Sequence, residues 1–448
     1  MIRDNDNHYH NNILKGGFLL PMIKSSFRTM ALCLSLLLAI ASVPFVAVAA
    51  ATPIKVVLDG KALSLASPPQ VINGITMVPF GPVVSNIGGK LTYDKATKKT
   101  KVTRGKTTAE IALNSNQATV NGKSVTLGAK VVAKDGQTLV PLQFLGDAFG
   151  LWVNWNAGAK TVSIDTKRTI THAMGNTTLT SAPKRVVVLF NGMVDISLTL
   201  GVKPVGAVES WVQAPWYHYL RADMGGVKNL GSELQPNIEA IVALKPDLII
   251  GAKTRHEKIY GQLSEIAPTL FMDQLFDWKG NMEMAAKALN KEAKSTTFIN
   301  DWNKRVADFK SKVSKNSSLA SAEVSIVRFQ EDSSARFYVT GFAGTILQEL
   351  GLKRPKAQQV KDKVLVNLTS QEQIPLMDGD IIFDITSSNG GGEEFKSQEE
   401  WQKNPLWNNL KGVKNGKYYK VNDITWNMSG GATAAKMMLD DLYFYFDL

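Results

Sequence analysis

The sequence predicts an α/β protein in which two Rossmann-like lobes are joined by a long helix and preceded by a small β-rich (α+β) tandem-repeat domain. Two similar lobes are predicted because one segment occurs twice, 133 residues apart, as Asn237 to Ile250 and as Ser370 to Phe383. The tandem domain is predicted by a second repeat, with a constant offset of 62 residues, between positions 54 and 166. A stretch of helix-forming residues without glycine or proline after Gly280 predicts a bridging helix over residues 278–316.

Residues 1–51 are predicted to be a signal peptide. Lys24 and Arg28 precede an apolar stretch that ends in small residues and offers cleavage after Ala49 or Ala51. An uncleaved anchor is the alternative, and Pro44 together with the small-residue ending favours cleavage. We therefore expect an exported protein, at the extracellular face of the cytoplasmic membrane or in the cell wall.

The only cysteine, Cys33, lies inside the apolar part of this signal. The mature chain is therefore expected to contain no thiol, no disulfide and no cysteine-bound metal. A lipid-modified cysteine would end the apolar stretch, whereas Cys33 lies near its beginning. A freely exported or wall-associated protein is accordingly favoured over a lipid-anchored one.

The chain has 448 residues, 44% of them hydrophobic and 20% charged, which is enough for two or three globular domains. Its formal net charge of +12 favours polyanionic partners or an anionic ligand, and export excludes nucleic acid. Part of the excess is local, between Lys95 and Lys106. A solvated strand edge explains this cluster most simply, and adhesion to an anionic cell-wall polymer is the alternative.

Residues 52–166 are predicted to form two copies of one small β-rich unit. Each copy has a hairpin signal, Asp59-Gly60 or Asn121-Gly122, followed by an amphipathic segment that opens with Val-Pro and ends at a glycine, and then by alternating strands. These features resemble the copper amine oxidase N-terminal-like domain, a repeat domain of exported Gram-positive proteins. Residues 52–168 contain no histidine or cysteine, so we infer no copper chemistry and expect a stalk or spacer.

From residue 169 onward, strand-like and helix-like segments alternate, which predicts a mainly parallel sheet. The N-lobe is predicted over residues 169–277, with strands at Val186–Leu189, Pro204–Val208 and Asp247–Ile250. The C-lobe is predicted over residues 317–448 and opens with the strand Val324–Val327. A helical bridge between the lobes is expected to hinge less freely than a pair of β linkers.

The sequence offers no enzyme active site. Outside the leader the only histidines are His172, His218 and His256, and none lies in a nucleophile motif or at the close spacing of a zinc site. No glycine-rich phosphate loop is present either. We therefore predict no catalytic residues, no protein-bound metal and no cofactor.

Aromatic and cationic residues instead follow the predicted strands, at the edge where open α/β sheets bind ligands. Two or three converging guanidinium groups would suit a delocalised oxyanion or a carboxylate ligand through bidentate hydrogen bonds. The predicted ligand-binding residues are Arg255, Arg328, Arg336, Trp211, Tyr217 and Trp426.

The region from residue 170 to 448 resembles the helical-bridge solute-binding proteins of ABC importers for iron–siderophore complexes. The resemblance rests on a combination of motifs: Ala182-Pro-Lys-Arg-Val-Val-Val188, Gly201-Val-Lys-Pro-Val-Gly206, the segment from Pro236 to Ile250, Leu350-Gly-Leu-Lys-Arg-Pro355 and Gly412-Val-Lys-Asn-Gly-Lys-Tyr-Tyr419. It implies a monomer that captures a ferric siderophore between its lobes, with the iron held by the siderophore alone. Gram-positive members are usually lipoproteins, and this chain departs from that pattern.

The resemblance also implies roles for individual residues. One glutamate on each lobe docks on arginines of the permease dimer, and these positions fall on Glu239 and Glu372. The segments around Arg255 and Arg328 resemble members that take hydroxamate or citrate-hydroxamate siderophores. Two alternatives stay open, a haem or cobalamin solute-binding protein and a wall-associated adhesion protein in which the basic repeat domain is the functional part.

Overall fold

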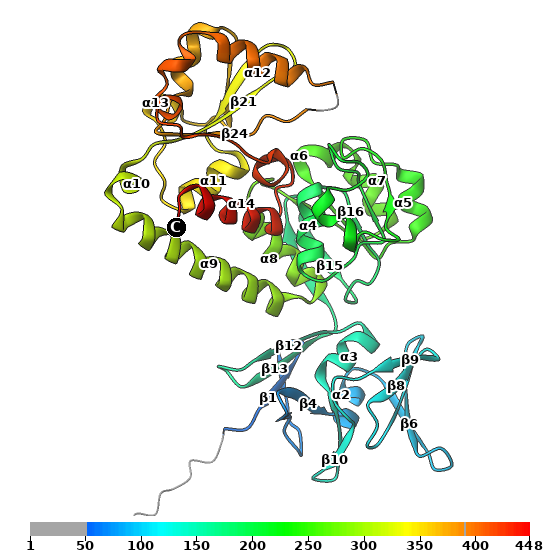
Figure 1. Cartoon of the computed structure of the whole chain (residues 1–448). Coiled ribbons are helices and arrows are strands. Elements are labelled where there is room, and N and C mark those ends of the chain that lie inside the picture. Colours follow the sequence, from blue (N-terminus) through cyan, green and yellow to red (C-terminus); the bar gives the residue numbers. More distant parts are fainter. Residues whose placement is uncertain (1–51, 389–390) are drawn as a thin grey trace, which may run out of the picture. The chain divides into compact units, whose positions relative to one another are not determined.

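The computed structural model describes residues 52–388 and 391–448, and the predicted signal peptide lies outside these residues (Figure 1). Residues 53–448 form one compact unit. In the described part of the chain, no helix has both the length and the apolar character that a membrane span requires.

The tandem-repeat domain consists of three small sheets and two short helices. The two repeat units pair with each other at their centre, where Val78 of the first copy lies opposite Val140, its equivalent 62 residues later. The elements are β1 (Lys55–Leu58), β2 (Lys61–Leu63), β3 (Gln70–Ile72), β4 (Ile75–Pro79), α2 (Phe80–Asn86), β5 (Lys90–Asp94), β6 (Lys99–Arg104), β7 (Thr107–Ala112), β8 (Gln117–Val120), β9 (Lys123–Thr126), β10 (Val132–Lys134), β11 (Gln137–Pro141), α3 (Leu142–Phe149), β12 (Trp152–Asn156) and β13 (Thr161–Asp165).

The copies exchange strands to form two matching sheets, which differ in one strand. The sheet with the order β12-β13-β1-β2 is matched by the sheet β5-β6-β7-β8-β9, in which β7 is an additional strand between β6 and β8. Both predicted hairpins are present, because Leu58 pairs with Lys61 and Val120 pairs with Lys123 across two-residue turns. The turn residues have positive φ angles, as two-residue hairpins require.

The polar stretch Asp165–Thr169 contains the end of one strand and the start of another. Asp165 ends β13, and Arg168 begins a hairpin formed by β14 (Arg168–His172) and β15 (Gly175–Leu179). The guanidinium of Arg168 forms an ion pair with Asp165 at 2.9 Å and a second one with Glu292. These ion pairs therefore hold the start of β14 against β13 and helix α9 (Glu292–Lys315).

The N-lobe has a five-stranded parallel sheet with the order β18-β17-β16-β19-β20. The strands at 186, 204 and 247 occur where they were expected, although the second is only two residues long. The elements are β16 (Val186–Val188), α4 (Asn191–Thr199), β17 (Gly206–Ala207), η2 (His218–Asp223), β18 (Lys228–Asn229), α5 (Ile238–Leu244), β19 (Leu248–Ala252), α6 (Lys253–His256), η3 (Glu257–Ile259), α7 (Tyr260–Ile266) and β20 (Thr269–Met272).

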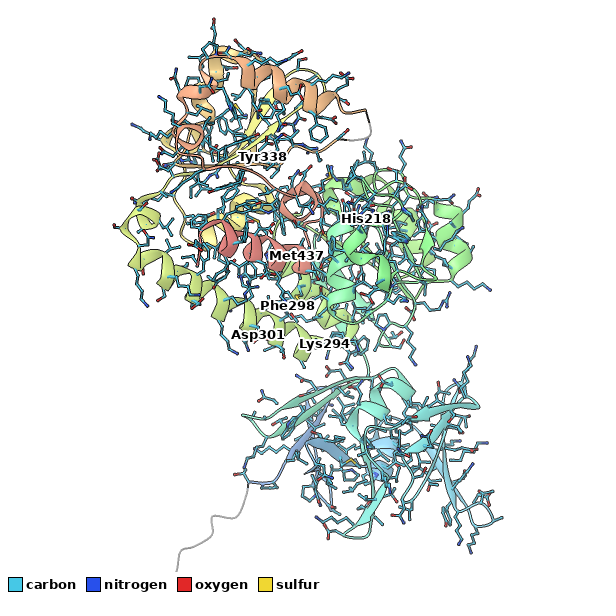
Figure 2. All side chains as sticks on the ribbon, in the orientation of Figure 1. His218, Lys294, Phe298, Asp301, Tyr338 and Met437 are labelled. Carbon is cyan, nitrogen blue, oxygen red and sulfur yellow. The ribbon has the colours of Figure 1, made fainter. Side chains whose placement is uncertain are left out.

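Two consecutive helices, α8 (Trp278–Leu289) and α9 (Glu292–Lys315), follow the N-lobe, and α10 (Ser317–Ser321) comes before the C-lobe. Along α9, Phe298 packs on the core while Lys294 and Asp301 are exposed (Figure 2). Glu349 of the C-lobe accepts a hydrogen bond from the indole N–H of Trp302 at 2.9 Å and forms an ion pair with Lys279 of α8. These bonds fasten both helices to the C-lobe.

The C-lobe sheet has the order β23-β22-β21-β24-β25, in which β22 is antiparallel to its neighbours. The prediction of a mainly parallel sheet fails at β22 because only five residues separate it from β21, too few for a parallel crossover. The elements are β21 (Val324–Phe329), β22 (Ala335–Tyr338), α11 (Gly341–Glu349), η4 (Lys356–Gln358), β23 (Leu365–Leu368), η5 (Gln371–Met377), β24 (Ile381–Asp384), α12 (Glu393–Lys403), η6 (Trp407–Asn409), α13 (Lys411–Lys414), β25 (Tyr418–Lys420), η7 (Ile424–Met428) and α14 (Ala432–Tyr445).

The duplicated segment has the same construction in both lobes. Asn237 caps α5 by accepting a hydrogen bond from the N–H of Ala240 at 2.8 Å, and Ser370 forms a capping box at the start of η5. Asp247 and Asp380 each accept backbone N–H bonds from the chain that leads into the neighbouring strand. The aspartate of the repeat is therefore a structural tie between two strands.

Candidate functional site

Both lobes have their five strands in the order 3-2-1-4-5, counted along the chain within each lobe. The strand order reverses direction between the first and fourth strands, and ligands of open α/β sheets bind outside the carboxyl ends of the strands at such a switch point. The residues after β16, β19 and β21 are therefore the first place to look for a site.

A cavity of about 340 Å³ lies at this edge and is lined by both lobes. The N-lobe contributes Phe190, Trp211, Glu233, Arg255, Leu275 and Phe276. The C-lobe and the segment that follows its sheet contribute Arg328, Gln330, Asn427, Met428 and Gly430. We refer to this cavity as the interlobe cleft.

On the N-lobe wall, Arg255 lies in α6 directly after β19 and pairs with Glu233. The Nε atom of Arg255 is 3.4 Å from Oε1 of Glu233, and the glutamate side chain is 1% exposed against 35% for the arginine. The other carboxylate oxygen accepts hydrogen bonds from the backbone N–H of Asn191 at 3.0 Å and from its side-chain amide at 2.8 Å. Burial raises the pKa of Glu233, and the bonds from Asn191 oppose that shift.

On the C-lobe wall, Arg328 lies near the end of β21 and pairs with Asp423. The distance from Nη2 of Arg328 to Oδ2 of Asp423 is 3.1 Å, and the two side chains are 12% and 0% exposed. The same oxygen accepts a hydrogen bond from the hydroxyl of Ser387 at 2.6 Å. Burial raises the pKa of Asp423, and Arg328 opposes that shift.

The two walls therefore share one design, a partly exposed arginine whose inner side is held by a buried carboxylate. The carboxylate fixes the guanidinium in one orientation, and a guanidinium has further N–H groups with which it can bind an oxygen-rich ligand. Among the described residues, Nε of Arg328 has no hydrogen-bond partner. Such a cleft is suited to a rigid, oxygen-rich anion.

His256 is buried beside the N-lobe pair and holds the loop that carries Glu233. Its Nδ1 accepts a hydrogen bond from the N–H of Ala252 at 3.1 Å, so the ring proton is on Nε2. This N–H donates a hydrogen bond to the backbone oxygen of Glu233 at 2.8 Å. Burial lowers the pKa of His256. The histidine is thus a neutral positioning residue.

Asp195 positions the segment that carries Asn427 to Gly430. Although it lies in α4 of the N-lobe, its carboxylate accepts backbone N–H bonds from Thr433 at 2.8 Å and Ala434 at 3.0 Å, at the start of α14. It also accepts a bond from the hydroxyl of Tyr219 at 2.7 Å. A buried carboxylate at the N-terminus of α14 therefore links the last helix to the N-lobe.

The structure brings together three of the six predicted ligand-binding residues. Arg255, Arg328 and Trp211, which is 45% exposed, all line the interlobe cleft. Arg336 lies opposite Arg328 on β22 and donates a hydrogen bond to Gln330, a lining residue, but does not itself line the cavity. Ligand contact by these residues stays a prediction.

Tyr217 and Trp426 were wrongly placed in the cleft. Both side chains are fully buried in the main core, where Tyr217 stacks on Tyr219 and Trp426 packs on Phe383 with ring centroids 4.6 Å apart. The indole N–H of Trp426 donates to Asp441 at 2.8 Å. The large aromatic surface of each side chain contributes more to stability when it is buried in the core than it would in an exposed loop.

Glu233 and Asp423, the two buried carboxylates that pair with the cleft arginines, were not predicted from the sequence. Neither belongs to a recognisable motif, since each follows a short strand in a loop of mixed composition. Both could have been sought as acidic partners of the predicted arginines, because an arginine that is held in one orientation at the end of a strand requires a nearby carboxylate. In the described part of the chain, no group of three or more His, Cys, Asp or Glu side chains could hold a metal ion.

Glu239 and Glu372 are exposed in the first turns of α5 and η5. Both elements follow strands whose carboxyl ends point to the cleft edge, so both glutamates lie at the edge of their sheet that also carries the cleft. No ion pair holds either of them within residues 52–388 and 391–448.

Comparison with known proteins identifies two families in the chain. The copper amine oxidase N-terminal domain matches residues 57–164, and the periplasmic binding protein family matches residues 186–425. A probable siderophore-binding lipoprotein of Bacillus subtilis, YfiY, is 45% identical over 293 residues, which are 64% of this chain and 89% of that protein. The achromobactin-binding periplasmic protein of Dickeya dadantii is 34% identical and covers 58% of this chain and 85% of its own length.

Among solved structures, Staphylococcus aureus SirA in complex with staphyloferrin B matches with a TM-score of 0.60 and 40% identity. The match covers 62% of this chain and 98% of SirA. Proteins of this family bind a solute and are exported, and the family is not catalytic. The chain therefore belongs to the periplasmic binding protein family, as an iron–siderophore solute-binding protein of ABC importers.

Proposed function

We propose that this protein captures a ferric siderophore of the hydroxamate or citrate-hydroxamate type in the interlobe cleft and delivers it to a membrane permease. The observation that carries the proposal is the pair of arginines, Arg255 and Arg328, on opposite walls of one cavity, each oriented by a buried carboxylate. The iron belongs to the cargo and is coordinated by the siderophore, so the protein supplies no metal ligand and no catalytic step.

Electrostatics supports an anionic ligand. When Glu233 and Asp423 are ionised, each of them compensates the charge of its arginine. The free protein can then keep the guanidinium N–H donors in the cleft without a large desolvation penalty. A ligand that brings several oxygen acceptors would pair with the outer N–H groups of both guanidiniums, and would thereby connect the two lobes. The relatives support the same class, since they include an iron(3+)-hydroxamate-binding and an Fe(3+)-citrate-binding protein of Bacillus subtilis, at 32% and 33% identity.

Tryptophan fluorescence tests the ligand. The purified mature chain is titrated with ferric hydroxamate, citrate-hydroxamate and catecholate siderophores, and with haem and cobalamin. We expect saturable quenching by a hydroxamate or citrate-hydroxamate complex, because Trp211 is exposed in the cleft. The variant Trp211→Phe should lose part of the quenching amplitude, whereas Trp155→Phe in the repeat domain should not. Saturation by haem with a Soret shift, or by cobalamin alone, would contradict the proposal.

Delivery is proposed to involve Glu239 and Glu372, one exposed carboxylate on each lobe. Their matched position at the cleft edge of the two sheets suits a partner with two basic patches, such as a permease dimer. A matched control exists in Glu265 and Glu400, which are exposed glutamates of α7 and α12. Replacing this second pair by alanine changes the net charge equally and should leave uptake unchanged.

The protein is expected to act as an exported monomer on the outer side of the cytoplasmic membrane. An anionic cell-wall polymer is a further candidate partner of the repeat domain, whose residues 53–166 carry thirteen lysines and arginines against six aspartates and glutamates. A stalk that holds the binding lobes near the wall would follow from such an attachment.

A further inference from the structure

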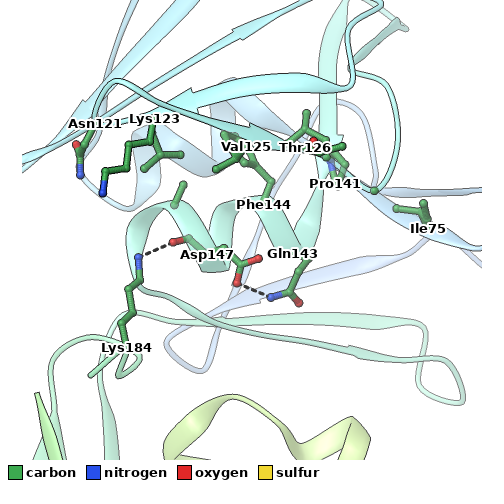
Figure 3. A pocket seen from close by; sticks show the side chains of 14 residues that line it. Ile75, Asn121, Lys123, Val125, Thr126, Pro141, Gln143, Phe144, Asp147 and Lys184 are labelled. Carbon is green, nitrogen blue, oxygen red and sulfur yellow. Dashed lines mark hydrogen bonds between the residues drawn. The ribbon is translucent and has the colours of Figure 1, made fainter. Parts of the chain in front are cut away.

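The repeat domain contains a larger cavity than the interlobe cleft, and no function described above uses it. This groove has a volume of about 940 Å³ and lies between the hairpin β8–β9 and helix α3 (Figure 3). Its walls are mainly apolar, with Val125 and Leu127 on the hairpin side, Phe144 and Ala148 on the helix side, and Ile75 at one end. The volume is close to the upper end of the usual range for small-ligand sites.

The hairpin side of the groove is the edge of a sheet. Strand β9 is the last strand in the order β5-β6-β7-β8-β9. Val120 and Lys123 flank a two-residue turn, so the backbone groups of Lys123 and Val125 pair with β8. The N–H and C=O groups of the alternate residues, Ser124 and Thr126, consequently point away from β8, and no backbone partner holds them within the described residues.

The groove is associated with strand β7, which one of the two matching sheets contains and the other lacks. The additional strand β7 separates β8 from β6, whereas the equivalent strands β1 and β13 pair directly. The hairpin β8–β9 is therefore displaced by one strand spacing, about 4.8 Å, relative to its counterpart β1–β2. Helix α3 contacts β7, and the space beyond it forms the groove.

The charge at the groove is mainly positive. Lys123 is exposed at the turn end of β9 and takes part in no ion pair among residues 52–388 and 391–448. Lys184 lines the same end, where its ammonium group donates to the backbone oxygen of Asp147 at 2.7 Å. The one acidic lining side chain, Asp147, accepts a hydrogen bond from Gln143 at 2.8 Å. The whole domain carries an excess of seven positive charges over residues 53–166.

We propose that this groove binds an extended acidic peptide segment of a partner protein, which adds to β9 as a sixth strand. The free N–H and C=O groups of Ser124 and Thr126 would pair with the peptide backbone, and an apolar peptide side chain would fill the space between Val125 and Phe144. Acidic groups of the peptide would lie near Lys123. An edge strand beside a helix-walled apolar groove provides both main-chain affinity and side-chain selectivity.

The test uses the full mature chain and a synthetic peptide in which valine alternates with aspartate. Binding is measured by fluorescence anisotropy, and hydrogen exchange is followed in the free and the peptide-bound protein. We expect saturable binding and slower exchange of the Ser124 and Thr126 amides. A peptide in which lysine replaces every aspartate should bind at least about tenfold more weakly, because it repels the basic domain.

The internal repeat supplies a matched control. Lys61 is the equivalent of Lys123 in the first copy and is also exposed. We expect Lys123→Glu to weaken peptide binding about tenfold and Lys61→Glu to change it less than about twofold, with equal urea midpoints for both variants.

Three results would overturn the proposal: no saturable binding of the aspartate peptide, equal binding of the lysine peptide, or protection confined to amides outside β9. Binding of inorganic polyphosphate without binding of the peptide would also overturn it, and would assign the basic domain to an anionic polymer.

Discussion

Replacing Arg328 by methionine removes one half of the ion pair on the C-lobe wall of the cleft. At 3.1 Å, the gross Coulomb attraction between Arg328 and Asp423 is about 5 kcal/mol for an effective dielectric constant of about 20. The net effect on folding differs, because the arginine is 12% exposed and the aspartate is fully buried. Removal of one partner from a buried pair leaves the other charge uncompensated, which destabilises proteins by about 3–5 kcal/mol. We expect a loss of this size in the free energy of unfolding of Arg328→Met.

The double variant Arg328→Met with Asp423→Asn separates folding from binding. The second substitution removes the uncompensated charge and keeps an acceptor for the hydroxyl of Ser387. Most of the lost stability should therefore return. Siderophore affinity should stay at least about tenfold weaker than in the wild type, because the guanidinium that faces the ligand is still absent and a charge-assisted hydrogen bond contributes about 1.5–3 kcal/mol.

Urea unfolding, monitored by tryptophan fluorescence, gives the stability of the wild type, the single variant and the double variant. Siderophore titration at neutral pH in a buffer without urea gives their affinities. Wild-type affinity in the double variant would refute a ligand contact by Arg328. Wild-type stability in the single variant would refute the buried pair. The contact of Arg328 with the ligand and the contribution of the buried pair to stability are thus tested independently.

Three further predictions concern charge, pH and the corrected aromatic site. The double substitution Glu239→Ala with Glu372→Ala should abolish siderophore uptake by cells and leave siderophore binding to the purified protein unchanged, and undiminished uptake would exclude docking through these residues. Burial raises the pKa of Glu233, so its contribution to stability is present below the ordinary carboxyl pKa and is lost as pH rises through the folded value. Glu233→Gln should accordingly gain stability relative to the wild type as pH rises above the ordinary glutamate pKa of about 4.3, and urea titrations that show a pH-independent difference would contradict this. Tyr217→Phe should change siderophore affinity less than about twofold, because the buried ring does not reach the cleft, and a larger loss in the same titration would return Tyr217 to the site.

Local signals in the sequence predicted much of the fold correctly. Hairpins were found from Asp59-Gly60 and Asn121-Gly122, because a two-residue turn with positive φ angles has a narrow choice of residues. The segment repeated at Asn237 and Ser370 was found from the sequence, and both copies open with a capped helical turn. The antiparallel strand β22 was missed, since strand direction depends on the length of a connection whose ends are not sharply marked in the sequence.

The candidate site was predictable only in part. Arg255 and Arg328 were found because a charged residue directly after an apolar strand has few structural roles. Tyr217 and Trp426 follow strands as well, yet their side chains turn into the core, and sequence position alone does not distinguish the two orientations. Glu233 was missed because its partner is adjacent only in space.

Both duplications in this chain follow the same physical rule. Where the copies agree, the shared residue connects neighbouring segments of backbone. Asp247 and Asp380 accept N–H bonds from the chain that leads into a neighbouring strand, and Val78 and Val140 pair with each other. Where the matching sheets of the repeat domain differ, a groove is present at the surface. The extra strand β7 separates β8 from β6, and the groove lies between the hairpin β8–β9 and helix α3. The matched glutamates of the lobes, Glu239 and Glu372, differ from this pattern, because both are exposed and no ion pair holds either of them among the residues that the structure describes. Contact with a symmetric partner is the explanation that we propose for this recurrence, and the uptake experiment tests it.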